Sequence, residues 1–159
     1  MANNVYAHLV YGFPVLTDEG EEFADAEHEP PVWLRDPTDE NKLLSLEEIV
    51  ARLEGIVSPT VEFDESNPQV LEKYQAYWDA KRKAEERSGI ALVQHCRAEH
   101  TMYILGISES DHNPWRGEAE RLGQRIEAKP DWREMLKSFC ERARIPFSEP
   151  EWLLAPFSE

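Results

Sequence analysis

The sequence predicts an α+β fold, with a small three- to four-stranded, mainly antiparallel sheet packed against three helices in a single domain, residues 1–159. Short stretches rich in β-branched and aromatic residues indicate strands, and three longer stretches carry apolar residues at helical spacing. Their order does not alternate strand with helix, which excludes a doubly wound parallel sheet. A chain of 159 residues is also an ordinary length for one domain.

The first strand is predicted over residues 5–13, VYAHLVYGF, and is expected to end at its glycine and the following proline. Residues 17–42 come next, with dense acidic residues, three prolines and no sustained period. This composition predicts a long, largely irregular acidic surface loop. Its few apolar residues, Phe23 and residues 32–34, are expected to anchor it.

Ser45 begins the first predicted helix. Ser45 and Glu48 form an S-x-x-E capping box, in which each side chain satisfies a backbone N–H of the helix start. Apolar residues then recur at helical spacing until Gly55, which suits a left-handed helix end. The connector that follows could hold a short strand at residues 60–63.

The longest helix is predicted from Pro68 to about residue 88. Tyr74, Tyr77 and Trp78 lie on one stripe of this helix. Such aromatic stripes are typical of a buried face, and we expect these residues in the core.

Residues 90–95 and 101–108 are predicted as a strand pair with a short connection. The second of them is apolar on both faces, as expected for a central strand. A last helix is predicted to begin at Pro130 and to bury a face that includes Trp132 and Cys140. Residues 146–159 contain three prolines and a few apolar anchors, and are expected to form an extended C-terminal strap.

The charge of the chain is strongly negative and uneven. The net charge is −15, and residues 1–66 hold 16 acidic but only 3 basic residues, a local net charge of −13. Such a field repels nucleic-acid phosphates and anionic membranes, and attracts basic proteins. The residues expected to bind a basic protein partner are seven acids of the loop: Asp18, Glu19, Glu21, Glu22, Asp25, Glu27 and Glu29.

The sequence also predicts a compartment. No apolar run approaches the roughly 20 residues needed to span a bilayer, and the start of the chain does not read as a secretory signal. Two cysteines are too few for a disulfide framework. We therefore expect reduced thiols and a cytoplasmic protein that contacts no membrane.

The stretch HCRAEHTMYILGISES, followed by NPWRGEAERL, the helix WREMLKSFCERARI and the tail PEWLL, resembles small accessory proteins of tailed phages and prophages. The similarity covers roughly the last 70 residues. Ala119 stands where that group would carry a proline, and the acidic N-terminal stretch has no counterpart there. The group has no established activity, so the resemblance implies a phage-type accessory protein, in the host cytoplasm, and no more.

Four residues form the candidate metal site: His95, Cys96, His100 and His112. Their spacing is compatible with zinc ligands at the mouth of a hairpin. However, His95 and Cys96 are adjacent, so a regular strand would point them to opposite faces. The alternative, which we favour, is that they are ordinary hairpin-end residues, hydrogen-bonded or solvated. Cys96 with a nearby histidine could also act as a thiolate nucleophile, which requires an oriented base.

No glycine-rich phosphate loop or serine nucleophile motif occurs in the sequence. We therefore expect no catalytic residue, cofactor or resident metal. The leading hypothesis is a noncatalytic interaction protein, in one form an inhibitor that mimics nucleic acid and occupies a basic host or phage protein such as a defence factor. The alternatives are a small metal-dependent or thiol enzyme centred on His95–His112, and an adaptor that pairs through a sheet edge or the Trp/Leu tail.

Overall fold

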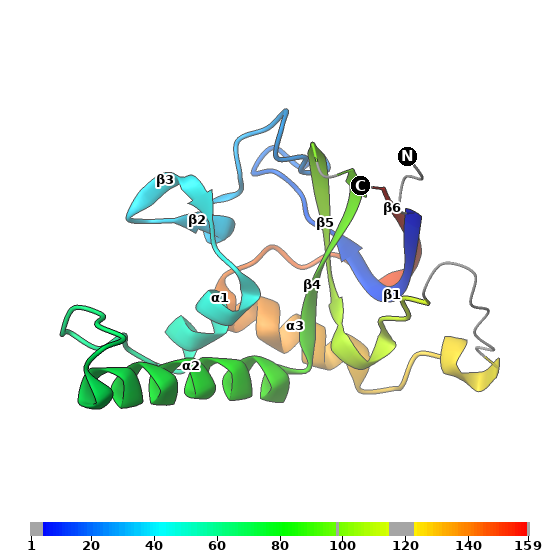
Figure 1. Ribbon diagram of the computed structural model, residues 1–159. Helices are drawn as coiled ribbons and strands as arrows, with labels where there is room; N and C mark the ends of the chain where they lie inside the picture. The colour runs from blue at the N-terminus through cyan, green and yellow to red at the C-terminus, as the bar shows by residue number, and fades with distance from the viewer. Residues whose placement is uncertain (1–4, 98, 115–122, 159) are drawn as a thin grey trace. The chain divides into compact units, whose positions relative to one another are not determined.

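A computed structural model describes residues 5–97, 99–114 and 123–158 of the chain (Figure 1). Within these residues it contains three α-helices, a four-stranded mixed sheet and a two-stranded hairpin, which confirms the predicted α+β class. The helices are α1 (Leu46–Leu53), α2 (Pro68–Ser88) and α3 (Trp132–Ala143). The strands of the main sheet are β1 (Val5–Pro14), β4 (Ile90–Arg97), β5 (His100–Ile107) and β6 (Glu151–Ser158).

The main sheet has the order β1-β5-β4-β6 and closes on itself, because β1 pairs with both β5 and β6. All pairs are antiparallel except the short parallel contact between β4 and β6. The β4–β5 hairpin is the predicted one, with a continuous register from Ile90↔Ile107 to Arg97↔His100. The predicted buried character of β5 is also confirmed, since Tyr103–Ile107 are all buried.

The sheet closes where two glycines face each other. Gly12 of β1 is paired with Gly106 of β5, and a Cβ on Gly12 would lie 2.3 Å from the carbonyl oxygen of Leu105. A Cβ on Gly106 would likewise lie 2.7 Å from the carbonyl oxygen of Tyr11. β1 ends at Pro14, one residue beyond the predicted range of 5–13, and the missing side chains of the two glycines let it pair closely with β5.

Small and β-branched side chains fill the interior of the closed sheet. Val10, Val93, Ile104 and Ala155 form one buried cluster, with one residue from each strand. Helix α3 buries Leu136, Phe139 and Cys140, as its apolar period predicted. The ring centroid of its first residue, Trp132, lies 5.8 Å from that of Tyr11 on β1 and 6.0 Å from that of Trp152 on β6.

The C-terminal segment is a strand of the sheet. Residues Glu151–Ser158 pair with β1 along their whole length, from Val5↔Ser158 to Gly12↔Glu151. Residues 146–159 are therefore not only the predicted extended strap, because most of them form a sheet strand that the sequence did not predict. The pairing includes Pro156, which lies opposite Ala7.

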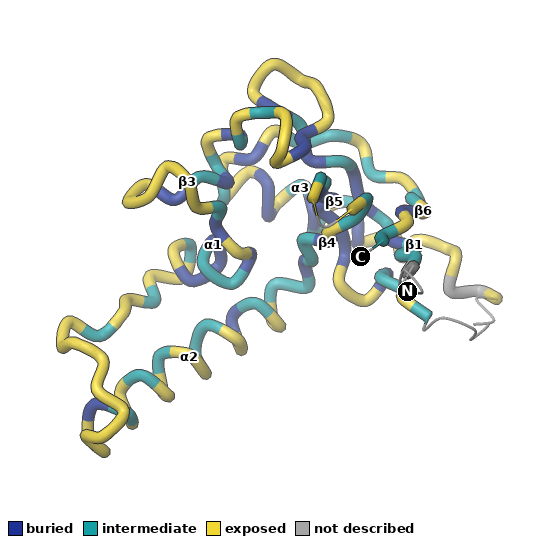
Figure 2. The backbone as a smooth tube through the Cα atoms, turned by 45° about the horizontal axis from the view of Figure 1, so that its top comes forward, coloured by how far each residue is buried: buried dark blue, intermediate teal, exposed yellow. Residues whose placement is uncertain are grey.

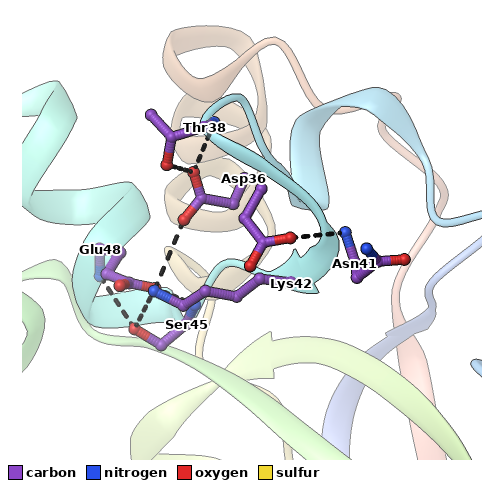
Figure 3. A network of polar contacts seen from close by, with 7 residues as sticks. Asp36, Thr38, Asn41, Lys42, Ser45 and Glu48 are labelled. Atoms are coloured by element: carbon purple, nitrogen blue, oxygen red, sulfur yellow. Dashed lines mark hydrogen bonds and ion pairs between the residues drawn. The ribbon is translucent and has the colours of Figure 1, made fainter.

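The chain divides into two compact units, residues 1–43 with 89–159 and residues 44–88. The second unit holds α1 and α2, which are linked by an ion pair of 2.6 Å between Arg87 and Glu54. The predicted capping box is present, with the Glu48 N–H donating to Ser45 Oγ and the Ser45 N–H donating to Glu48 (Figure 3). The description of the whole chain as one domain stays a prediction, since compactness does not show whether either unit folds alone.

The aromatic stripe of α2 differs from its prediction. Trp78 is 44% exposed and Phe63, from the preceding connector, is 45% exposed, although both rings pack with Tyr74. In α2 only Val70 and Ala84 are buried. Residues 60–63 also form no strand. Helical periodicity correctly placed Tyr74 and Trp78 on one face of α2. This face does not enter the core as predicted, and its rings form an aromatic cluster with Phe63 that is partly exposed.

The acidic N-terminal segment contains more regular structure than predicted. It holds a 3₁₀ turn, Val32–Leu34, and a hairpin of β2 (Arg35–Asp36) and β3 (Asp39–Leu43). Asp36 organises this hairpin, because its carboxylate accepts hydrogen bonds from the N–H and hydroxyl of Thr38 at 2.9 and 2.7 Å (Figure 3). These bonds, with Lys42 at 3.5 Å, lower the pKa of Asp36.

Candidate partner-binding surface

Within the predicted acidic segment 17–42, residues 17–29 carry the seven predicted partner-binding carboxylates and are named the acidic loop from here on. All seven residues are exposed (Figure 2). Phe23 anchors the loop, with 1% of its surface exposed. Its ring stacks on Tyr103 of β5 with a centroid distance of 5.9 Å, and its N–H donates to the carbonyl of Val15 at 2.8 Å. The loop is therefore tied to the central strand by an apolar side chain and a backbone bond.

A tight turn shapes the first part of the loop. The Thr17 N–H donates to the carbonyl of Glu21 at 2.7 Å, and the Glu21 N–H donates back to the Thr17 hydroxyl at 3.2 Å. Gly20 has a φ of 90° inside this turn, a conformation that side chains disfavour. Thr17 is itself buried, so the turn that presents Asp18 and Glu19 rests on the body of the unit.

A pair of hydrogen bonds also attaches the acidic loop to the start of β5. The Asp25 N–H donates to the carbonyl of Thr101 at 3.0 Å, while the Thr101 N–H donates to the Asp25 carboxylate at 2.9 Å. Ala24, which forms a bridge with Met102, is 2% exposed. Asp25 thus has a structural role that sequence reasoning did not assign, and the other six carboxylates remain to face a partner.

Two histidines and one arginine lie near the loop carboxylates, and sequence reasoning assigned none of these contacts. His28 lies 3.5 Å from Glu21, and His100 lies 3.7 Å from Glu27. Arg35 lies 3.3 Å from Glu29 and 3.9 Å from Asp18. These are exposed contacts of low individual strength. Even with these three basic side chains beside them, the seven carboxylates leave the loop with a net negative charge.

The four residues of the candidate metal site lie on three parts of the fold. His95 and Cys96 are on β4, His100 begins β5, and His112 follows the 3₁₀ turn Ser108–Ser110. The backbone of His112 exchanges two hydrogen bonds of 2.9 Å with Leu9 of β1. Among residues 5–97, 99–114 and 123–158, no three His, Cys, Asp or Glu side chains come together as a group that could hold a metal ion.

Neither cysteine is placed with an oriented base by the described contacts. Cys140 is buried in α3, and this burial raises the pKa of its thiol to about 12, which disfavours the reactive thiolate. Cys96 lies opposite Thr101 in the β4–β5 ladder with a φ of 81°. Both cysteines are free, and the reduced state of their thiols stays a prediction.

His8, which the sequence analysis did not single out, forms the shortest described contact between a histidine and a carboxylate. Its Nδ1 lies 2.8 Å from Asp111, and its side chain is 17% exposed. The charge of His8 also acts on His95. No local sequence pattern could have paired residues 103 positions apart.

His95 provides a prediction of pH dependence. Burial is the main cause that lowers its pKa, and His8 adds to it while Glu22 opposes it. The folded protein therefore binds this proton less readily than the unfolded chain does, so acidification through the range from the ordinary histidine pKa to the lowered one favours unfolding. We expect His95→Gln to lose less unfolding free energy than the wild type between about pH 7.5 and about pH 5.5 in urea titrations. Equal losses in the two proteins would contradict the prediction.

Glu109 lies in the 3₁₀ turn Ser108–Ser110, which directly follows β5. It accepts bonds from Lys129 at 2.6 Å and from the Trp132 indole at 2.8 Å, and these two bonds lower its pKa. Glu109 thus holds the residues before α3 in place rather than facing a second carboxylate.

Within the part of the chain that the structure describes, no helix has the length and apolar character needed to cross a bilayer. Searches of protein-family models, curated proteins and solved structures find no match to this chain.

Proposed function

We propose that the protein is a noncatalytic interaction protein whose acidic loop binds a basic protein partner. One observation supports this most strongly: the exposed carboxylates lie on a loop that buried Phe23 and two backbone ties hold in place. Like charges in a short loop repel one another and cost stability. A loop that is anchored to the rest of the protein, and that still holds these carboxylates close together, is well suited to present them to cations.

The anchoring of the acidic loop also favours binding because less conformational entropy is lost when the complex forms. A disordered acidic segment would lose conformational entropy on binding, whereas a loop already ordered in the free protein loses less. Surplus negative charge also steers a basic partner toward the surface and accelerates association, an effect that salt weakens. The proposed complex therefore forms quickly and is sensitive to ionic strength.

The partner class follows from the charge. A surface that repels phosphates does not bind nucleic acid directly, but it can occupy the basic site of a protein that does. The resemblance of roughly the last 70 residues to phage and prophage accessory proteins supports such a protein of the host or phage, in the host cytoplasm. We propose inhibition of a nucleic-acid-binding factor as the form of this activity.

A pull-down from host lysate, coupled to mass spectrometry, tests the proposal. We expect a basic, nucleic-acid-binding protein that is released as salt rises from about 0.1 M toward about 1 M. A partner that is not basic, or one retained unchanged at about 1 M salt, would contradict it. Stoichiometric zinc in the purified protein that is lost in His100→Ala would instead favour the alternative, a metal-dependent enzyme.

A further inference from the structure

A small pocket lies beside the acidic loop. Its volume is about 200 Å³, and its wall includes Phe13, Val15, Pro31, Trp33 and Ile145. Binding sites for small molecules are usually larger, at about 300–1,000 Å³. The size and apolar wall suit a single side chain of a protein partner, the kind of anchor that often dominates an interface.

Trp33 contributes an unused aromatic group to this wall. It is partly buried, and among the described residues its ring packs on no other aromatic ring and its indole N–H donates no hydrogen bond. Tryptophan offers the strongest aromatic face for a cation. Trp33 is therefore available to a group that enters from outside.

Asp18 supplies a negative charge to the same pocket. Its side chain is 45% exposed. Its described contacts are long, at 3.4 Å from the Val32 N–H and 3.9 Å from Arg35, so the carboxylate keeps lone pairs for a stronger donor. The pocket thus combines an indole, an apolar wall and a carboxylate, next to six further exposed acids.

We propose that this pocket binds an arginine side chain of the basic partner. The aliphatic part of the arginine would pack on the apolar wall, its planar guanidinium would stack on Trp33, and its N–H groups would donate to Asp18. Lysine fits less well, because its ammonium is compact, strongly hydrated and unable to stack. This inference rests on the proposed function, since it identifies the anchor residue of the same partner.

Calorimetric titration with three acetylated peptide amides of equal length tests the proposal. The peptides carry arginine, lysine or leucine at the same positions. We expect the arginine peptide to bind about three- to tenfold more tightly than the lysine peptide, and the leucine peptide not to bind. Trp33→Leu should remove the preference for arginine while leaving the lysine peptide unaffected, and Trp78→Leu, at an exposed tryptophan of α2, is the matched control.

Each other result has a distinct meaning. Equal binding of the arginine and lysine peptides, or a preference that survives both Trp33→Leu and Asp18→Asn, overturns the arginine pocket but leaves the proposed function intact. Tighter binding of the leucine peptide shows an apolar occupant and also overturns it. Failure of both basic peptides to bind contradicts the proposed function itself. Asp18→Asn keeps the test decisive should Trp33→Leu fail to fold.

Discussion

Replacing Gly12 with alanine is expected to destabilise the protein by about 3 kcal/mol or more, the upper end of the range for overpacked interiors. The added Cβ would lie 2.3 Å from the carbonyl oxygen of Leu105 and 2.6 Å from the Cα of Gly106. Both atoms belong to the backbone, so no side-chain rotation relieves the clash. Strands β1 and β5 would have to separate where the sheet closes.

Gly20→Ala is the matched control for this prediction. Gly20 has a φ of 90°, but a Cβ there would meet no atom within 4 Å. It should therefore cost only the strain of the left-handed conformation, about 1–2 kcal/mol. Urea unfolding followed by circular dichroism measures both variants. Gly12→Ala with the stability of the wild type, or a smaller loss than Gly20→Ala, would show that sheet closure does not depend on the glycine contact.

The local parts of the fold could be predicted from the sequence. The capping box at Ser45 and Glu48 marks a helix start within a few residues, and that helix forms with both capping bonds. The β4–β5 hairpin was predictable because two β-rich stretches flank a short connection. In both cases the residues that make the structure are neighbours in the chain.

The parts that failed depend on distant residues. β6 contains Pro156, and proline argues against a sheet strand, yet its pairing with β1 runs past Ala7↔Pro156. The exposure of Trp78 shows the converse limit, since periodicity identifies a helix face but not what covers it. The contact of Gly12 with Gly106 joins strands far apart in sequence, and no local pattern reports it.

The candidate partner-binding surface was likewise only partly predictable from the sequence. Composition alone located the seven acidic residues, because clustered charge is visible in any sequence. The anchoring of this loop could not be predicted, because it depends on the packing of Phe23 against Tyr103, 80 positions later in the chain. The pocket beside Asp18 brings residues 13–33 together with residues 145–148, and Trp33 was assigned only as an anchor.

Neutralising the loop carboxylates is expected to have the largest effect on partner binding. Four of them can be changed to glutamine without touching the structural bond of Asp25 to Thr101. The loop variant carries the substitutions Glu19→Gln, Glu21→Gln, Glu22→Gln and Glu27→Gln. Each exposed ion pair contributes about 0.2–1 kcal/mol, so four should weaken binding at least about fourfold.

A control variant removes the same charge elsewhere. It carries the substitutions Glu62→Gln, Glu65→Gln, Glu72→Gln and Glu141→Gln, all at exposed positions outside the loop. Its net charge equals that of the loop variant. At about 0.1 M salt the screening length is about 10 Å, so charges far from the bound partner contribute little.

The most direct test of the acidic loop as the binding surface is the affinity of the loop variant, the control variant and the wild type for the lysine peptide, measured by calorimetry at about 0.1 M salt. If the loop is the surface, the loop variant loses at least about fourfold in affinity and the control variant loses about twofold or less. Equal losses in the two variants would mean that net charge alone attracts the peptide and that the loop is not a binding surface.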